Sequence, residues 1–452
     1  MEREHDFTRG AILPALIRFA LPVLLALFLQ AMYGAVDLQV VGKYGTAADI
    51  SAVSTGSQIM QNITVLFTSL AMGITVLLGQ KLGEGRAEEG GRVIGAGMTL
   101  FGAVTLVATA LSIAFAPQMA AILKAPEDAF AGTVAYVRIC SAGTLFIVAY
   151  NLVGSIFRGI GDAKMPLITV SIACVLNIAG DLLLVALFHM GVAGAAIATV
   201  FAQAVSVLLS LLIIRRRSLP FAFSRRSIRF DAPMIRSILH IGVPIAFQEL
   251  LVGASFLVML AIANSMGTIP SAGVGVAEKL CAFVMLIPSA YSQSTTAFVA
   301  QNIGAGEEKR ARRALLCAIG SSLVVSVAVF ALVFFRGELL AAVFADDALV
   351  IAAAAEYLRA YAIDCLLTSV MFSMVGYFNG CGRTMFTMVQ GIVGAFGVRL
   401  PMALVMSRVF PGSLFALGLA TPSSTLVQIV LCLWYDRRCA RRRHEVRSRD
   451  EG

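Results

Sequence analysis

Apolar stretches of about 20 residues or more alternate with short polar segments along almost the whole chain. A helix needs about 20 mainly apolar residues to cross the roughly 30 Å hydrocarbon core of a bilayer. With that length as the measure, the pattern predicts twelve transmembrane helices. We place them at residues 15–41, 51–77, 93–115, 135–157, 165–188, 192–214, 237–262, 272–300, 314–335, 356–378, 384–408 and 413–435.

The predicted helices form two sets of six, because the chain repeats itself. Three motifs of the first half return 221 residues later: Gln80-x-x-Gly83-x-Gly85 as Gln301-x-x-Gly304-x-Gly306, Tyr136-x-Arg138 as Tyr357-x-Arg359, and Gly159-x-Gly161 as Gly380-x-Gly382. Six crossings give both halves the same orientation, which implies a pseudo-twofold axis along the membrane normal. The predicted fold class is an all-α membrane protein with twelve transmembrane helices in two pseudo-twofold-related six-helix bundles. Two such bundles around a cavity are typical of transporters.

The basic residues predict the topology. Of the 35 Lys and Arg residues, 27 fall in segments on one side of the twelve-helix layout, the side that the positive-inside rule assigns to the cytoplasm. We therefore expect a multi-pass protein of a bacterial cytoplasmic (inner) membrane with both termini in the cytoplasm. The expected parts are an N-terminal lobe at 1–214, a basic cytoplasmic linker at 215–236, a C-terminal lobe at 237–435 and a basic tail at 436–452.

Composition excludes a soluble or nucleic-acid-binding protein. Hydrophobic residues make up 59% of the chain and charged residues only 13%, whereas soluble domains carry about 25% charged residues. The formal net charge is +9, but the basic residues lie in short clusters between apolar runs rather than along a groove with interleaved aromatics. We expect the chain to be embedded in the lipid bilayer and to bind no nucleic acid. We also expect it to act as a monomer.

Four polar residues of the first half are candidates for an ion site. An ionised Asp at the centre of a membrane helix costs about 2.5 to 3.5 kcal/mol, so it indicates a partner or a function. Asp37 lies near the outer end of the first predicted helix, and Asp181 about two turns from the outer end of the fifth. Asn177 is one turn before Asp181, and Thr199 lies at a similar depth in the sixth helix. Two carboxylates, an amide and a hydroxyl at one depth suit a small cation or a proton.

The order and spacing of these residues resemble the MATE (multidrug and toxic compound extrusion) family, in particular its DinF- and MepA-like bacterial branches. The resemblance covers nearly all of residues 10–435 and lies in five motifs: Val36-Asp37 with Val41-Gly42, Gln80-Lys81-Leu82-Gly83-Glu84-Gly85, Phe157-Arg158-Gly159-x-Gly161-Asp162, Asn177-x-x-Gly180-Asp181, and Gly191-Val192-Ala193-Gly194-Ala195-Ala196-x-Ala198-Thr199. It implies that Asp37, Asn177 and Asp181 form a cation-binding site, with Thr199 as its fourth member.

The resemblance also implies the activity. A MATE-like protein would be a secondary active multidrug efflux transporter that exports xenobiotics, mainly amphipathic and often cationic small molecules, by alternating access. The coupling ion is H⁺ or Na⁺, and the residues leave that choice open. No cofactor is expected, and no metal beyond Na⁺ at Asp37, Asn177 and Asp181. Polar residues near the middle of several predicted helices are candidates for the lining of a substrate cavity: Gln30, Tyr33, Gln61, Asn62, Gln203, Gln248 and Glu249.

The second half carries further charges inside its predicted helices. NorM-type members of the family have an acidic sodium site in the C-terminal lobe, and no motif of that kind aligns with this sequence. Glu278, Asp364 and Arg399 are nevertheless candidate buried charges. Asp364 and Arg399 lie at similar depths from the outer side, which predicts a buried ion pair between them.

Other classes of membrane protein fit the sequence less well. A related lipid-linked-sugar flippase would have more helices and several basic residues in its cavity, and a metabolite exporter remains the other alternative to drug efflux. A polytopic membrane enzyme would need a positioned base, commonly His. The four histidines, His5, His189, His240 and His444, all fall at termini or at the ends of predicted helices. We therefore expect no enzymatic activity.

Overall fold

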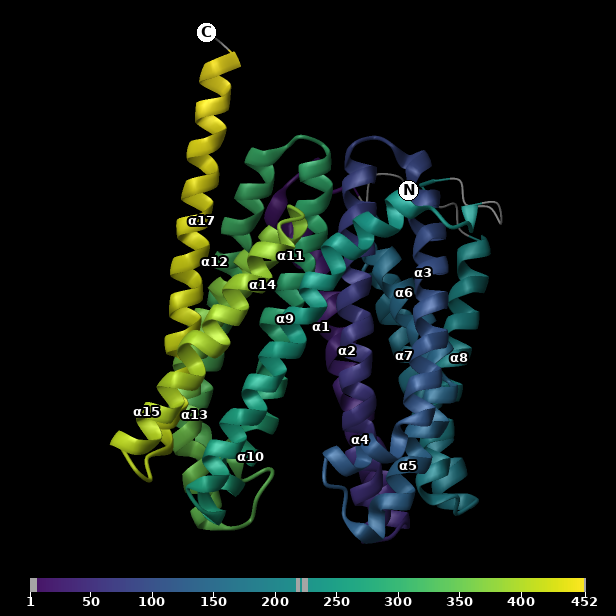
Figure 1. The fold of residues 1–452 in the computed structure, drawn as a ribbon, viewed down its shortest axis with the longest axis vertical. Helices are drawn as coiled ribbons and strands as arrows, with labels where there is room; N and C mark the ends of the chain where they lie inside the picture. The colour runs from purple at the N-terminus through teal and green to yellow at the C-terminus, as the bar shows by residue number, and fades with distance from the viewer. Residues whose placement is uncertain (1–5, 217–219, 222–226, 451–452) are drawn as a thin grey trace. The chain divides into compact units, whose positions relative to one another are not determined.

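The computed structural model describes residues 6–216, 220–221 and 227–450, and all regular structure in this part of the chain is helical (Figure 1). Among the described residues, eleven helices are long and apolar enough to cross a membrane, and one bent pair of shorter helices brings the number to 12. The predicted all-helical membrane fold with twelve spans is confirmed. The first-half elements are α1 (Ile12–Tyr44), α2 (Ala47–Gly83), α3 (Ala87–Ala114), α4 (Ala116–Ile122), α5 (Glu127–Ala142), α6 (Thr144–Ile160), α7 (Lys164–Asp181), the π-helical segment η1 (Leu182–Leu187) and α8 (Gly191–Arg216).

The second half has the corresponding series of helices. Its elements are α9 (Ala232–Ser265), α10 (Thr268–Val284), α11 (Leu286–Gly304), α12 (Glu308–Ala341), α13 (Ala348–Gly380), α14 (Thr384–Ile392), the π-helical segment η3 (Val393–Arg399), α15 (Leu400–Val409), α16 (Leu414–Gly418) and α17 (Ala420–Asp450). The last helix, α17, runs well past the apolar stretch predicted at 413–435 and ends near the C-terminus (Figure 1).

The fourth span differs from its prediction. An uninterrupted helix was predicted at 135–157, whereas the chain bends by 55° between α5 and α6. The break falls at Gly143, which lies directly against α8: a Cβ on Gly143 would sit 2.3 Å from Cγ1 of Val200. Hydrophobicity continues through the break, and the pattern of apolar residues therefore gives no sign of it.

The chain forms two compact units. Unit 1 comprises Met1–Ala246, Ala297–Ala311 and Gly380–Gly382, and unit 2 comprises Phe247–Thr296, Arg312–Asn379 and Arg383–Gly452. These units follow packing, whereas the predicted lobes at 1–214 and 237–435 follow the repeat, and the lobe boundaries stay a prediction. Residues 217–219 and 222–226 of the predicted linker, and 451–452 of the tail, lie outside the described residues.

Each unit has its own apolar core. In unit 1, one core joins α2, α3 and α6 to the beginning of α9, with Ile74, Phe101 and Ile238 almost completely buried. A second core of unit 1 joins α1 and α2 to α5 and α8. In unit 2, α9, α10 and α13 pack around Met259 and Tyr357. Burial of these side chains positions the polar groups described below.

The repeated glutamine–glycine motif lies where α2 crosses α11 in unit 1. A Cβ added to Gly83 would lie 2.0 Å from the carbonyl oxygen of Gln301, and a Cβ added to Gly304 would lie 2.1 Å from the carbonyl oxygen of Gln80. These distances are far below van der Waals contact, so only glycine allows the two backbones to approach this closely. The two copies of the motif therefore pack against each other.

The glutamines of the motif fasten this crossing reciprocally. Nε2 of Gln80 donates a hydrogen bond to the carbonyl of Gly380 at 3.1 Å, and Nε2 of Gln301 donates one to the carbonyl of Gly159, also at 3.1 Å. Gly159 and Gly380 are themselves repeat partners. Each half thus donates from its own glutamine to the other half's glycine, and two repeated motifs together provide both sides of the contact.

The segment before α1 is anchored to the same region of unit 1. Phe7 is 4% exposed and stacks on Phe298, with ring centroids 4.9 Å apart. Arg310 donates hydrogen bonds to the carbonyls of Phe7, Arg9 and Gly10 at 2.7–2.9 Å. The guanidinium therefore satisfies three backbone acceptors that lack helical partners.

The start of α9 is held by a charge pair. Arg92 of α3 contacts the carboxylate of Asp231 at 2.7 Å, and the other oxygen of Asp231 accepts the backbone N–H of Met234. The hydrogen bond from Arg92 holds the pKa of Asp231 below its usual range. Asp231 thus acts as an N-terminal cap for α9 while it fixes that end of the helix to α3.

Gly83→Ala should destabilise the protein, because its methyl group would force α2 away from α11. An overpacking cost on the order of 1–3 kcal/mol is expected, visible as a lower unfolding temperature of the detergent-purified protein. The matched control is Gly102→Ala in α3, where nothing lies within 4 Å of the added Cβ. If the two variants unfold at the same temperature, the close backbone contact is not part of the stable structure.

Candidate functional site

Three helices of unit 1 bring the four predicted ion-site residues together. Asp37 lies on α1, Asn177 and Asp181 lie one turn apart on α7, and Thr199 lies on α8. Asp37, Asn177 and Asp181 are 5%, 1% and 0% exposed, which places two carboxyl groups deep in a membrane-embedded core. Gly180 permits the close approach of α7 to α8, since a Cβ there would lie 2.9 Å from the Cβ of Ala198.

The side chains of the site point toward one another. Nδ2 of Asn177 donates to Oγ1 of Thr199 at 3.4 Å, and Oγ1 of Thr199 lies 3.4 Å from Oδ2 of Asp37. The same hydroxyl lies 3.0 Å from the carbonyl of Ala195, one turn earlier on α8. The carboxyl groups of Asp37 and Asp181 come within hydrogen-bonding reach of each other.

Several oxygens of this cluster lack a partner within the protein. Oδ1 of Asp37, Oδ1 of Asn177 and both carboxyl oxygens of Asp181 are buried without a hydrogen bond. No ion pair in the described part of the chain involves either carboxylate. Oxygens of carboxylates and carbonyls are the donors preferred by hard cations. The arrangement is chemically suited to hold a proton or one small cation.

A polar layer surrounds the site. Tyr33 lies on the Asp37 side of α1 and interacts with Gln30 and Gln203, and Oε1 of Gln203 is buried without a partner. These three predicted cavity residues therefore lie together next to Asp37. Tyr136 of α5 is 3% exposed and interacts with Thr199, although it was not predicted for the site. The repetition of Tyr136 as Tyr357 was the one sequence feature that singled it out. A repeat indicates that two segments have similar structures, but it does not indicate which groups a side chain contacts.

Comparison with known proteins identifies the family. The MatE family model matches residues 22–183 and 244–405 of this chain, which is both halves of the repeat. The chain belongs to the MATE family. Curated relatives include the probable multidrug resistance protein YpnP of Bacillus subtilis, 25% identical with 90% of this chain and 91% of the relative covered. The multidrug export protein MepA of Staphylococcus aureus is 23% identical, with 90% of each chain covered.

Solved MATE structures share the fold. A MATE crystal structure in complex with MaD3S superposes with a TM-score of 0.90 at 20% identity and covers 97% of this chain and 98% of its own. A MOP-superfamily transporter from Pyrococcus furiosus superposes with a TM-score of 0.91, with the same identity and coverage. The chain is thus a membrane protein of a transporter family with small-molecule substrates, and the first matched segment contains Asp37, Asn177 and Asp181.

The remaining predicted cavity residues of this MATE protein are not part of the Asp37 cluster. Gln61 and Asn62 are exposed on α2. Gln248 and Glu249 lie on α9 in unit 2. Gln248 is half-buried, with Oε1 unpartnered, and packs against Gly391, whereas Glu249 is exposed. Their roles as cavity lining stay predictions.

The predicted ion pair between Asp364 and Arg399 does not form. Asp364 is 3% exposed and accepts a hydrogen bond from Thr368 at 2.9 Å. Arg399 is 5% exposed, donates to Ser255 at 2.9 Å and stacks on Phe256 with its guanidinium carbon 4.2 Å from the ring centroid. Asp364 and Arg399 therefore each form a hydrogen bond with a different residue instead of with each other. Glu278 on α10 is half-buried, and its Oε1 has no hydrogen bond.

The contacts of Arg399 predict that a lysine cannot replace it. Arg399→Lys keeps the positive charge but loses the planar stacking on Phe256 and shortens the reach to Ser255. We expect a loss of about 1–2 kcal/mol in stability, seen as a lower unfolding temperature. Arg408→Lys, an exposed exchange on α15, is the control and should leave the unfolding temperature unchanged. An unchanged temperature for Arg399→Lys would indicate that charge alone, acting on Asp364, accounts for this residue.

Proposed function

We propose that this MATE protein is a secondary active multidrug efflux transporter, which exports amphipathic and often cationic small molecules in exchange for H⁺ or Na⁺ by alternating access. The observation that carries the proposal is the cluster of four buried, unpartnered oxygens on Asp37, Asn177 and Asp181. The names of the relatives YpnP and MepA refer to multidrug resistance and export, and support the same class of substrate here.

Electrostatics explains why this cluster would couple transport to an ion. Two carboxylates in a low-dielectric interior repel each other strongly, and no basic side chain pairs with them in the described part of the chain. A proton shared by Asp37 and Asp181 removes one negative charge, and Na⁺ bound to the carboxylate, amide and hydroxyl oxygens neutralises one. Both ions suit the donor set, so either gradient can act at the same residues.

Coupling requires that the ion prefer one conformation. An ion that binds two conformations equally shifts nothing. In the neutralised site α1 and α7 can remain packed, whereas loss of the ion leaves the two carboxylates repelling each other and favours a rearranged α1. Substrate release and ion uptake on the outer side would then follow from the same equilibrium, and the inward ion gradient would drive export. In this proposal the protein acts as a monomer and has no enzymatic step.

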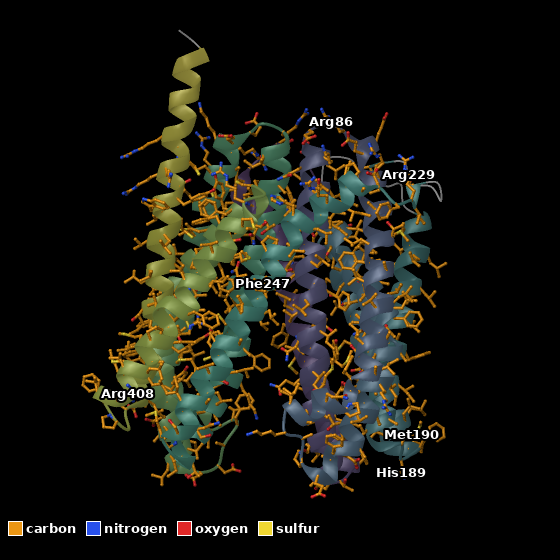
Figure 2. All side chains as sticks on the ribbon, viewed as in Figure 1. Arg86, His189, Met190, Arg229, Phe247 and Arg408 are labelled. Carbon is orange, nitrogen blue, oxygen red and sulfur yellow. The ribbon has the colours of Figure 1, made fainter. Side chains whose placement is uncertain are left out.

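The proposed location is a bacterial cytoplasmic membrane, with both termini inside. In unit 1, Arg86 and Arg229 lie at one end of the helices, and His189 and Met190 lie at the opposite end (Figure 2). In unit 2, the C-terminal end of α17 lies opposite Arg408 (Figures 1 and 2). The positive-inside rule assigns the end of unit 1 that carries Arg86 and Arg229, and the C-terminal end of α17, to the cytoplasm. This orientation places the Asp37 cluster in the outer half of unit 1.

Asp37→Asn should fold and reach the membrane but lose most gradient-driven efflux, because asparagine keeps the size of the side chain and cannot take up a proton or neutralise a cation. Asp181→Asn should be impaired in the same way. The measurement is efflux of a panel of amphipathic dyes with everted vesicles under separately imposed proton and sodium gradients. We expect at least a tenfold loss of the gradient-dependent rate, about 1.4 kcal/mol in activation free energy.

Asp128→Asn is the control for this measurement, since it makes the same chemical change at an exposed residue of α5. It should transport like the unmodified protein under both gradients. Normal ion-dependent efflux by a well-expressed Asp37→Asn protein would contradict the coupling role and shift attention to Glu249 and Glu278. Loss of efflux without loss of substrate binding would agree with a site for the ion rather than for the drug.

The orientation makes a separate prediction. A fluorescent reporter that matures only in the cytoplasm should fluoresce when fused after Gly452, and alkaline phosphatase, which is active only in the periplasm, should be inactive there. Alkaline phosphatase inserted in the loop between α15 and α16 should be active. The reverse result at these two positions would invert the proposed topology.

A further inference from the structure

A pocket of about 340 Å³ opens between α14–η3 and α17 within unit 2. One wall consists of Val389, Gln390 and Val393, and the facing wall contains Leu431, Trp434 and Arg438. A stacked pair of rings, Phe386 and Tyr435 at 3.8 Å, lines it as well. The ion-coupling site of unit 1 shares no residue with this pocket.

The walls are apolar and open to the outside of the helices. Val389, Val393 and Trp434 are 51%, 41% and 54% exposed, which suits a surface in contact with lipid. Trp434 and Tyr435 are of the residue types that gather at the boundary between hydrocarbon and headgroups. The pocket therefore lies at the level of the lipid headgroups, and an acyl chain can reach the part of the pocket that is nearer the centre of the membrane.

One polar side chain in the wall has no partner. Gln390 is 1% exposed, and neither its Nε2 nor its Oε1 makes a hydrogen bond within the protein. An amide buried without hydrogen-bond partners destabilises the protein. An acceptor on a ligand would satisfy its Nε2, and the ester carbonyl groups of a glycerophospholipid are acceptors of this kind.

The charge at the rim is positive. The guanidinium of Arg438 lies 5.4 Å from the ring centroid of Trp434, and that of Arg383 lies 5.7 Å from that of Tyr435. None of the residues that line the pocket is acidic. Asp436 nearby is already paired with Arg312 at 2.7 Å. A phosphate group at the rim would meet arginine without an acidic competitor.

We propose that this pocket binds one anionic phospholipid of the surrounding bilayer, with its phosphate at Arg438, its glycerol ester region at Gln390 and part of an acyl chain along Val389 and Val393. With the orientation proposed above, the lipid belongs to the cytoplasmic leaflet, whose anionic lipids attract basic segments next to membrane helices. The lipid would fasten α17 to α14. The site is independent of the coupling ion, so its test does not depend on transport.

Trp434 is the only tryptophan of the chain and lines the pocket, so its fluorescence reports on this site. The full-length protein is reconstituted in phosphatidylcholine nanodiscs that contain a small fraction of phosphatidylglycerol or phosphatidylcholine with brominated acyl chains, which quench tryptophan on contact. We expect brominated phosphatidylglycerol to quench about fivefold more effectively at equal mole fraction, the factor that one arginine contributes near an anionic surface. Equal quenching by the two lipids would overturn the proposal.

Two variants and a control locate the lipid. Arg438→Gln should abolish the preference for phosphatidylglycerol, whereas Arg437→Gln, the same change one residue earlier and outside the pocket lining, should retain it. Gln390→Met should weaken the preference without lowering the unfolding temperature, because the amide it removes has no partner in the protein. Equal losses in Arg437→Gln and Arg438→Gln would show general attraction to the tail and contradict a defined site. Displacement of both brominated lipids by an amphipathic cation would assign the pocket to an exported compound and also overturn the proposal.

Discussion

Inside a bilayer no water is available to satisfy polar groups, so every buried donor and acceptor must find its partner within the protein. The helical fold meets this constraint for the backbone, and glutamine, serine and threonine side chains meet it at the helix contacts, as Thr75 does with the carbonyl of Ser155 and Thr296 with that of Gly376. A buried polar atom that has no partner in the protein can be satisfied by a bound ion or molecule. The largest local concentration of unsatisfied oxygens is on Asp37, Asn177 and Asp181, and a second place is the amide of Gln390.

The repeat shows how one sequence motif can satisfy this constraint twice. The offset of 221 residues predicted two similar halves, and the MatE matches at 22–183 and 244–405 agree with it. The offset did not predict that Gln80 and Gln301 would donate into each other's half, because a repeat reports internal similarity and not contact between its copies. A motif close to a twofold axis must pack against its own copy. Glycine at Gly83 and Gly304 is then required on both sides at once, as in any interface that a twofold axis relates to itself.

Depth along a helix predicted one polar cluster correctly and another incorrectly, and the reason is geometric. Whether two side chains meet depends on their depth in the membrane and on the direction in which each points around its helix axis. The sequence positions give the depth but not always the direction. Asn177 and Asp181 lie one regular turn apart on α7, before the π-helical segment η1 begins at Leu182, so their shared face was predictable. Arg399 ends the π-helical segment η3, whose wider turns rotate it away from the direction that an α-helix would give. Hydrophobicity does not reveal a π-helical segment, and the partners Ser255 and Phe256 were therefore missed.

The two halves also differ in charge, which bears on where the proposed ion coupling would take place. The equivalent tyrosines Tyr136 and Tyr357 are both almost completely buried, and each interacts electrostatically with the acidic group of its own half, Asp37 or Asp364. In unit 2 the buried groups Asp364 and Arg399 have opposite signs and attract each other without contact, so their charges cancel inside that unit. In unit 1, by contrast, the two buried carboxyl groups have no cation beside them in the described residues, so an ion from outside the protein would balance their charge at the place where we propose coupling.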